Sequence, residues 1–195
     1  MGKIVCLMGK SSTGKDTIFK ELLEDGTIGC ETIVPYTTRP IREGEENGVE
    51  YFFTDEENFQ KLKASGKVIE DRAYDTVYGL WRYFTVDDGQ IQLEHKSYLV
   101  IGTLEAYHKL SAYFGKSNVL PVLVEVDDGV RLQRALDRER RQPQPKYEEM
   151  CRRFLADSKD FSEEKIAEAG NVARFCNDTL KECIEEIRAY IKDNI

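Results

Sequence analysis

The sequence predicts an α/β fold, in which a parallel sheet is covered by helices on both faces. Two observations support this. Short apolar segments at residues 4–8, 98–101 and 119–126 have the length and character of buried strands. Each is followed by a segment whose apolar residues recur at helical spacing. The chain has 195 residues, about the size of one such domain.

The helices can be predicted in chain order. The strand at 4–8 ends in a glycine-rich turn, and residues 16–24 beyond it have one apolar helical face. A helix at 104–114 follows the second strand, and a long charged helix beginning near residue 130 follows the third. At the C-terminus, apolar side chains recur at helical spacing over 180–191, which predicts a final helix packed on the core.

Two stretches interrupt the alternation of strands and helices. Residues 34–85 are rich in Tyr, Thr, Glu and Gly, and predict short antiparallel strands with one helix near 56–65. Residues 131–153 hold seven of the thirteen arginines and contain Pro143 and Pro145, which break a helix. Such a charge run is either a solvated helix face or a lid that closes over phosphate. We therefore expect a single domain with a core of residues 1–33, 86–130 and 154–195, an insert of 34–85, and a lid of 131–153.

The formal net charge of −8 argues against binding to duplex nucleic acid, which requires a broad basic face. It leaves room for a small anionic ligand, because the lid segment alone has eight basic and four acidic residues. No apolar segment is long enough for a membrane span, and the apolar stretch at 4–8 is too short for a signal peptide. The five cysteines lack metal-ligand spacing, so we expect reduced, buried thiols in a cytoplasmic protein.

A phosphate-binding motif follows the first strand. The segment Gly9-Lys10-Ser11-Ser12-Thr13-Gly14-Lys15-Asp16-Thr17 has the spacing G-x-x-x-x-G-K-[ST], with the final position altered. The glycines allow backbone N–H groups to converge, the following helix offers its positive end, and Lys15 adds a point charge for the β- and γ-phosphates. The motif predicts a nucleotide site within a three-layer P-loop NTPase core. The residues predicted to bind ATP are Gly9, Ser11, Ser12, Thr13, Gly14, Lys15, Asp16 and Thr17.

Asp16 stands where this motif has Ser or Thr, whose hydroxyl normally ligates Mg²⁺. A carboxylate also ligates Mg²⁺, since the ion prefers hard oxygen ligands, but it adds negative charge beside the phosphates. Asp16 is therefore either the metal ligand or only an acidic residue of the first helical turn, with the hydroxyl of Thr17 one residue further on.

The segment Thr37-Thr38-Arg39-Pro40-Ile41-Arg42-Glu43-Gly44-Glu45-Glu46-Asn47-Gly48-Val49-Glu50-Tyr51-Phe52-Phe53 supplies a longer signature. It closely resembles the T-T-R-x-x-R-x-G-E-x-x-G-x-x-Y-x-F pattern of the guanylate kinase family. Further matches follow in order along nearly the whole chain. They are Glu70, Tyr78-Gly79, the arginine-rich segment, and Asn177-Asp178 before the last helix.

The resemblance implies a nucleoside monophosphate kinase that uses ATP and Mg²⁺ to convert GMP or dGMP into the diphosphate. Residues 34–85 would then be the monophosphate-binding region. By position, the acceptor phosphate would be held by Arg39, Arg42, Tyr51 and Tyr78. The carboxylate of Glu70 would accept from N1–H and the N2 amino group of guanine, which adenine lacks. Charge on the transferring phosphoryl group would be neutralised by Lys15, Arg134, Arg138 and Arg153.

Four further positions depart from the family pattern. Pro35 and Leu80 stand where a hydroxyl side chain touching the base is expected, and Ile101 and Thr103 replace the two aspartates of a D-x-D strand end. We hypothesise that Asp16 supplies the missing carboxylate. Because of these departures, two alternatives stay open: a kinase with a different small acceptor, and a non-catalytic binding module. Retention of Lys15 and the arginines favours an enzyme.

Overall fold

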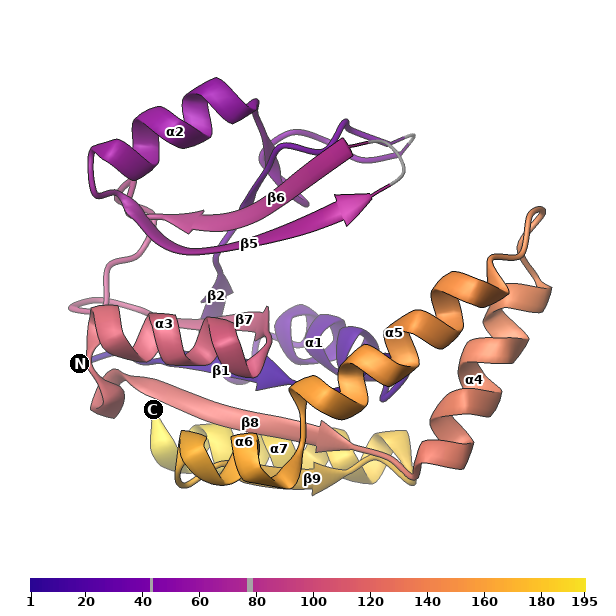
Figure 1. Cartoon of the computed structure of the whole chain (residues 1–195). Coiled ribbons are helices and arrows are strands. Elements are labelled where there is room, and N and C mark those ends of the chain that lie inside the picture. The colour runs from indigo at the N-terminus through magenta and orange to yellow at the C-terminus, as the bar shows by residue number, and fades with distance from the viewer. Residues whose placement is uncertain (43, 77–78) are drawn as a thin grey trace.

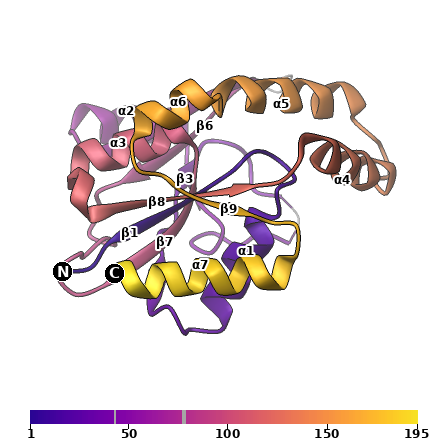
Figure 2. The same ribbon diagram turned by 90° about the horizontal axis from the view of Figure 1, so that it is seen from below.

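The computed structural model describes residues 1–42, 44–76 and 79–195 of the chain. Its elements form a three-layer α/β core with a smaller sheet above one edge and a pair of helices projecting from one end (Figure 1). Viewed at right angles, the core sheet lies between two groups of helices (Figure 2). The predicted fold class, a parallel sheet covered on both faces, is confirmed.

The core sheet has five parallel strands in the order β2-β7-β1-β8-β9. The three strands predicted from apolar runs are its centre: β7 (Ser97–Gly102), β1 (Ile4–Met8) and β8 (Val119–Glu125). All five residues of β1 are fully buried, since this strand has neighbours on both sides and helices on both faces. The edge strands β2 (Cys30–Thr32) and β9 (Ala173–Cys176) were not predicted, because they are short and only partly apolar.

Alternate side chains of β1 enter two separate cores, as a strand between two helical layers requires. Val5 and Leu7 pack with α1 (Lys15–Glu24) and α7 (Leu180–Asn194). Ile4, Cys6 and Met8 pack on the other side with α3 (Leu104–Phe114) and α6 (Glu163–Ala169). The two layers are visible above and below the strands in Figure 2.

The insert forms a four-stranded sheet in the order β4-β3-β6-β5. The strands are β3 (Tyr36–Thr37), β4 (Phe52–Phe53), β5 (Val68–Thr76) and β6 (Gly79–Val86). The expectation of short antiparallel strands is wrong in two respects: β3 and β4 pair in parallel, and β5 and β6 are long. The predicted helix is present as α2 (Glu56–Ala64), whose Phe59 packs on Phe84.

The arginine-rich segment forms two helices, α4 (Asp128–Arg140) and α5 (Tyr147–Asp160), joined by residues 141–146 with the two prolines. The helices project together from the end of the core where β8 finishes (Figure 1). A 3₁₀ turn at Lys116–Asn118 connects α3 to β8. None of the helices in the described ranges combines the length and apolar character that crossing a bilayer needs.

All five cysteines are free, but only part of the expectation about them holds. Cys6 and Cys183 are buried, and burial raises the pKa of the Cys6 thiol to about 12. Cys151 and Cys176 are exposed, so the expectation that the thiols are buried is wrong for these two. Cys151 lies on the projecting helix α5 and Cys176 ends the edge strand β9, and both are at the surface.

The core between the small sheet and α2 rests on few residues, of which Phe59, Phe84 and Val86 are fully buried. We predict that Phe84→Ala lowers the free energy of unfolding by about 3–5 kcal/mol, because it leaves a cavity in a core too small to refill it. Urea denaturation measures this change. Leu155→Ala is the control, since Leu155 is 69% exposed, and a loss for Phe84→Ala no larger than for the control would contradict the prediction.

Candidate functional site

The phosphate-binding loop is a direct continuation of β1. Gly9 follows the strand with its Cα against β8, where a Cβ would lie 2.6 Å from the carbonyl oxygen of Val124. Gly14 has a φ of 89° and caps the N-terminus of α1, a backbone conformation that side chains other than glycine rarely adopt. Ser12, with a φ of 65°, also lies in the left-handed region. The loop therefore turns within six residues and ends at the positive end of α1.

Asn177, which follows β9, holds the phosphate-binding loop in place. Its side chain, 2% exposed, donates from Nδ2 to the carbonyl oxygen of Thr13 at 2.7 Å. Its backbone N–H donates to Glu125 at the end of β8 at 2.8 Å. A Cβ on Gly14 would strike the same amide group, so glycine is needed there for packing as well as for φ. The sequence pattern marked Asn177 only as a family match, and the structure shows how it supports the loop.

Lys15 and Asp16 lie together at the start of α1. The Lys15 ammonium is 3.4 Å from a carboxylate oxygen of Asp16, and the Asp16 side chain is 73% exposed. No group of three His, Cys, Asp or Glu side chains in the described ranges is arranged to hold a metal. A metal here would therefore take one carboxylate from the chain and its other ligands from phosphate and water, which is how Mg²⁺ usually binds beside nucleotides.

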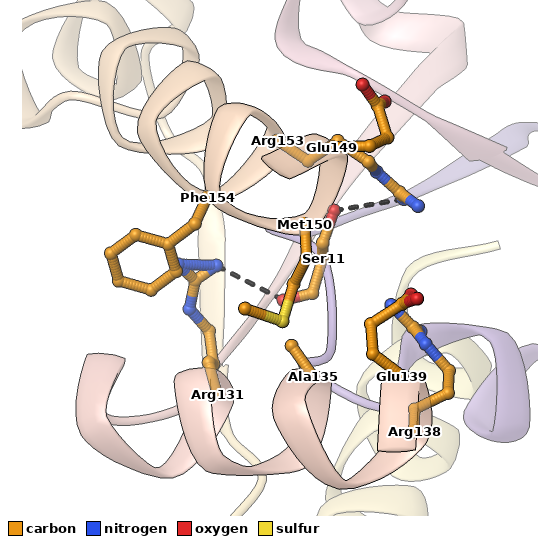
Figure 3. Close-up of a pocket in the computed structure, with 9 residues that line it drawn as sticks. All are labelled: Ser11, Arg131, Ala135, Arg138, Glu139, Glu149, Met150, Arg153 and Phe154. Atoms are coloured by element: carbon orange, nitrogen blue, oxygen red, sulfur yellow. Dashed lines mark hydrogen bonds between the residues drawn. The ribbon is translucent and has the colours of Figure 1, made fainter. Parts of the chain in front are cut away.

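Three side chains of the two projecting helices converge on Ser11, and two of them, Arg131 and Arg153, are drawn in Figure 3. Asp157 accepts from the Ser11 backbone N–H at 2.6 Å, and Arg131 donates to the Ser11 carbonyl oxygen at 3.2 Å. Arg153 donates from Nη2 to the Ser11 hydroxyl at 3.1 Å. Helices α4 and α5 are thus bonded to the phosphate-binding loop, which excludes the simpler interpretation of the arginine run as a solvated face alone.

Arg131 is the buried centre of this junction. Its side chain is 1% exposed and pairs with Asp128 at 3.0 Å and Asp157 at 3.6 Å, while its guanidinium lies 4.8 Å from the ring centroid of Phe154. Sequence reasoning missed Arg131 and Asp157. The available signal was an arginine three residues ahead of Arg134, at the spacing that places two side chains near each other on one helix.

The predicted lid arginines lie around the same loop. Arg134 is exposed and directs Nη2 to the Asn177 carbonyl oxygen at 3.5 Å. Arg138 and Arg153 line a small pocket between the helices and the loop, with the guanidinium of each exposed at its rim (Figure 3). The residues lining this pocket are Ser11, Arg131, Ala135, Arg138, Glu139, Glu149, Met150, Arg153 and Phe154.

The small sheet carries the predicted acceptor residues. Arg39 is 3% exposed and makes a two-pronged ion pair with Glu45, with N···O distances of 2.8 and 2.5 Å. Its guanidinium also lies 5.2 Å from the ring centroid of Tyr51, so these two predicted phosphate ligands are in contact with each other. Arg42 is exposed, and its backbone N–H donates to Glu45 at 2.8 Å. Tyr78 lies outside the described residues.

Glu70 is buried near the start of β5, with 3% of its surface exposed. The Thr85 hydroxyl on the paired strand donates to Oε1 at 2.9 Å. Arg72, two residues along the same strand, donates from Nε to Oε2 at 3.2 Å and from Nη2 to Oε1 at 3.4 Å. Glu70 is thus not a solvated strand-end glutamate, and sequence reasoning overlooked Arg72 because it lies outside the motif.

The departures from the family pattern have local explanations in part. Thr103 is the N-cap of α3, and its side chain accepts from the Ala106 N–H at 3.2 Å. Ile101, at the end of β7, is 37% exposed, and Leu80, at the start of β6, is 48% exposed. Neither of these exposed apolar positions offers a ligand for metal or a donor for a base. Pro35 precedes β3 and also has no side-chain donor.

The Arg39–Glu45 pair generates a pH prediction. The bonds from Arg39 hold the pKa of Glu45 at about 2, below its ordinary value of 4.5. Because the folded-state pKa is lowered, the stabilisation from this pair is complete above pH 4.5 and is lost as the pH falls through about 2. NMR titration of the Glu45 carboxyl carbon should show this low midpoint. In an Arg39→Ala variant the midpoint should return toward 4.5, and an ordinary midpoint in the unsubstituted protein would contradict the pairing.

Comparison with known proteins agrees with this geometry. Residues 1–83 match the family model described as guanylate kinase. A guanylate kinase of Symbiobacterium thermophilum is 40% identical over 79 residues, covering 40% of this chain and 37% of that protein. A guanylate kinase of Neisseria gonorrhoeae is 39% identical over 100 residues, covering 51% of this chain and 46% of that protein. The alignments thus span less than half the length of these curated relatives.

The structural comparison extends over nearly the whole chain. A crystal structure of guanylate kinase from Anaplasma phagocytophilum superposes with a TM-score of 0.68, covering 98% of this chain and 85% of that one, at 18% sequence identity. That likeness shows that the two chains share one fold. Residues 1–83 hold both the phosphate-binding loop and the Arg39 to Tyr51 signature. Residues 1–83 of this chain are therefore similar in sequence to guanylate kinases, and the chain as a whole shares the fold of the guanylate kinase from Anaplasma phagocytophilum.

Proposed function

We propose that the protein transfers the γ-phosphate of ATP to GMP or dGMP, giving ADP and GDP or dGDP. The main support is the buried Glu70, bonded by Thr85 and Arg72 on the same small sheet that carries Arg39 and Tyr51. One sheet thus offers a base-reading carboxylate and, separately, a cationic and phenolic cluster suited to a phosphate. The donor site stands at the end of the neighbouring core sheet, where the phosphate-binding loop begins.

The donor nucleotide would bind along the loop from Gly9 to Thr17. Backbone N–H groups and the N-terminus of α1 face the phosphates, and Lys15 contributes a positive charge to the β- and γ-phosphates. Arg134, Arg138 and Arg153 would neutralise charge on the transferring group from the lid, residues 131–153. The Arg153 contact with Ser11, at 3.1 Å, already places one of these guanidinium groups at the loop.

The acceptor would bind with its phosphate toward Arg39, Arg42, Tyr51 and Tyr78. Glu45 occupies one edge of the Arg39 guanidinium and fixes its orientation, while Arg42 keeps an exposed guanidinium for the phosphate. Burial raises the pKa of Tyr51, and the nearby Tyr83 adds to this effect, so its hydroxyl stays protonated as a neutral donor. A dianionic phosphate prefers this combination of guanidinium and hydroxyl donors.

Phosphoryl transfer then needs alignment more than covalent help from the protein. An oxygen of the acceptor phosphate attacks the γ-phosphorus in line, and the bond from that phosphorus to the β–γ bridging oxygen breaks, so that ADP leaves. Mg²⁺, when bound, neutralises phosphate charge, and Asp16 would be its carboxylate ligand. Closure of the lid and the monophosphate-binding region, residues 34–85, would exclude water as a competing acceptor.

The proposal also includes the domain organisation, the location of the protein and its partners. The core would consist of residues 1–33, 86–130 and 154–195. The protein would act in the cytoplasm on small nucleotides, without a nucleic-acid or membrane partner. The alternative of a different acceptor is favoured by one observation, the lack of side-chain donors at Pro35 and Leu80.

The experiment that tests this function measures ADP formation with ATP, Mg²⁺ and a panel of nucleoside monophosphates. Turnover should be restricted to GMP and dGMP. Lys15→Met should lower kcat by at least about a hundredfold, because a charge aimed at the transferring phosphoryl group is lost. Lys20→Met, an exposed lysine on the same helix, is the matched control. Turnover with another monophosphate would replace GMP as the acceptor, and nucleotide binding without any turnover would support a binding module.

A second prediction concerns Asp16 as the carboxylate beside the metal. Asp16→Ser should weaken the binding of Mg²⁺, raising the Mg²⁺ concentration for half-maximal rate by about tenfold, because a charged ligand becomes a neutral one. Rates measured across a Mg²⁺ series give this value. Asp25→Ser, at the end of the same helix, provides the comparison. If Mg²⁺ dependence and turnover stay unchanged in Asp16→Ser, the residue is only an acid in the first turn of the helix.

A further inference from the structure

The Glu70–Arg72 pair holds a feature that the proposed roles leave unused. Glu70 and Arg72 are two residues apart on β5, so both side chains project from one face of the strand. Their charges meet at 3.2 and 3.4 Å in a largely buried setting, with Glu70 2% and Arg72 19% exposed at the side chain. A pair so enclosed is costly to desolvate unless its remaining donors and acceptors are also satisfied.

Glu70 and Arg72 keep hydrogen-bonding groups that their known bonds do not use. Glu70 has about four lone-pair sites on its two oxygens and accepts three bonds from Thr85 and Arg72. Arg72 has five N–H groups and directs two of them at Glu70, so that three have no partner within the described ranges. The carboxylate therefore keeps one free acceptor site, and a second becomes free if Nη2 of Arg72, whose bond at 3.4 Å is the longest of the three, turns to a ligand. The adjoining guanidinium presents its unused donors beside these acceptors.

Neighbouring side chains place this edge inside the acceptor site. Arg72 lies opposite Tyr83 in the sheet register, and Tyr83 makes an edge contact with Tyr51 at 5.6 Å between ring centroids. Tyr51 in turn lies against Arg39. Arg72 thus stands between the buried Glu70 and the predicted phosphate-binding cluster. Burial lowers the pKa of Arg72, but the charge and hydrogen bonds of Glu70, together with the nearby Tyr74, outweigh it and raise that pKa, so the guanidinium stays charged.

The hydrogen-bonding pattern of guanine fits this edge. Along its rim the base presents the N2 amino donor, the N1–H donor, and then the O6 and N7 acceptors. A carboxylate beside a guanidinium presents acceptors followed by donors, which is the complementary order, and arginine is the common partner of guanine O6 and N7 in proteins. Adenine places an amino donor where guanine has O6, so the same guanidinium would face another donor.

We propose that Arg72 is a specificity-determining residue of the acceptor site, donating to O6 of guanine while Glu70 accepts from N1–H and the N2 amino group. This inference rests on the proposed function, since it assigns a second reader to the same base. It also supplies a donor at the base, which the side chains of Pro35 and Leu80 cannot provide.

The test compares GMP with 6-thio-GMP, which differs from GMP only in having sulfur, a weak acceptor, in place of O6. Both acceptors keep N1–H and the N2 amino group, so any change in Glu70 affects them alike and cancels in their ratio. The unsubstituted protein should prefer GMP in kcat/KM by roughly tenfold. In Arg72→Ala, kcat/KM for GMP should fall by about ten- to a hundredfold and the preference should approach unity.

Arg82→Ala is the matched control, because Arg82 lies on the adjacent strand but pairs with Glu56 of α2, away from the acceptor residues. Its GMP to 6-thio-GMP ratio should equal that of the unsubstituted protein even if the variant is less stable. Arg72→Lys keeps the charge but loses the planar fork, and should give an intermediate ratio. Thermal melting of each variant confirms that the compared proteins are folded.

The possible outcomes separate the two proposals. Absence of GMP turnover in the unsubstituted protein removes the proposed function itself. GMP turnover with an unchanged ratio in Arg72→Ala overturns only the role of Arg72 and leaves it a structural partner of Glu70. A rise in kcat/KM for GMP in Arg72→Ala also overturns it, since Arg72 would then be blocking Glu70 rather than reading the base.

Discussion

The burial of β1 between β7 and β8 is the constraint on which the rest of the structure depends. The strand has no exposed residue, and its side chains alternate between two cores, so neither its position nor its register is free to shift. Because β1 cannot shift, the start of the loop at Gly9 is also fixed in position. It is further fixed by Asn177, which reaches it from the end of β9. The proposed phosphate site is thus built directly on a fully buried strand of the core sheet.

The projecting helices and the small sheet are anchored in different ways. Helices α4 and α5 contact the loop through charged groups around Ser11, with Arg131 as a buried cation between two carboxylates. The small sheet has its own apolar core around Phe59 and Phe84, and Ile69 of β5 packs into the main core. Ion pairs hold the helices to the loop, so added salt weakens that attachment. Apolar packing holds the small sheet together, so substitution of its core side chains weakens it.

The sequence predicted the strands and helices whose pattern is strongest. The runs at 4–8, 98–101 and 119–126 are confirmed as β1, β7 and β8, and 104–114 as α3. The edge strands β2 and β9 could not be predicted, since three or four mixed residues carry no clear period. Among candidate site residues, Lys15, Arg39 and Glu70 belong to motifs. Arg72, Arg131 and Asp157 do not. Arg131 and Asp157 bond Ser11, which lies far along the chain, and Arg72 bonds Glu70 from two residues away on the same strand.

The bond between the Asp157 carboxylate and the Ser11 N–H has a further consequence, because it gives the loop an anion of its own. An oxygen of a bound phosphate that takes this N–H must first displace the carboxylate. The free energy of that bond is then subtracted from the affinity of the incoming ligand. A small inorganic anion recovers little of this cost, whereas a nucleotide with several phosphates and lid contacts recovers more. The Asp157 carboxylate would thus compete with small anions for the Ser11 N–H and increase the preference of the loop for a nucleotide over inorganic phosphate.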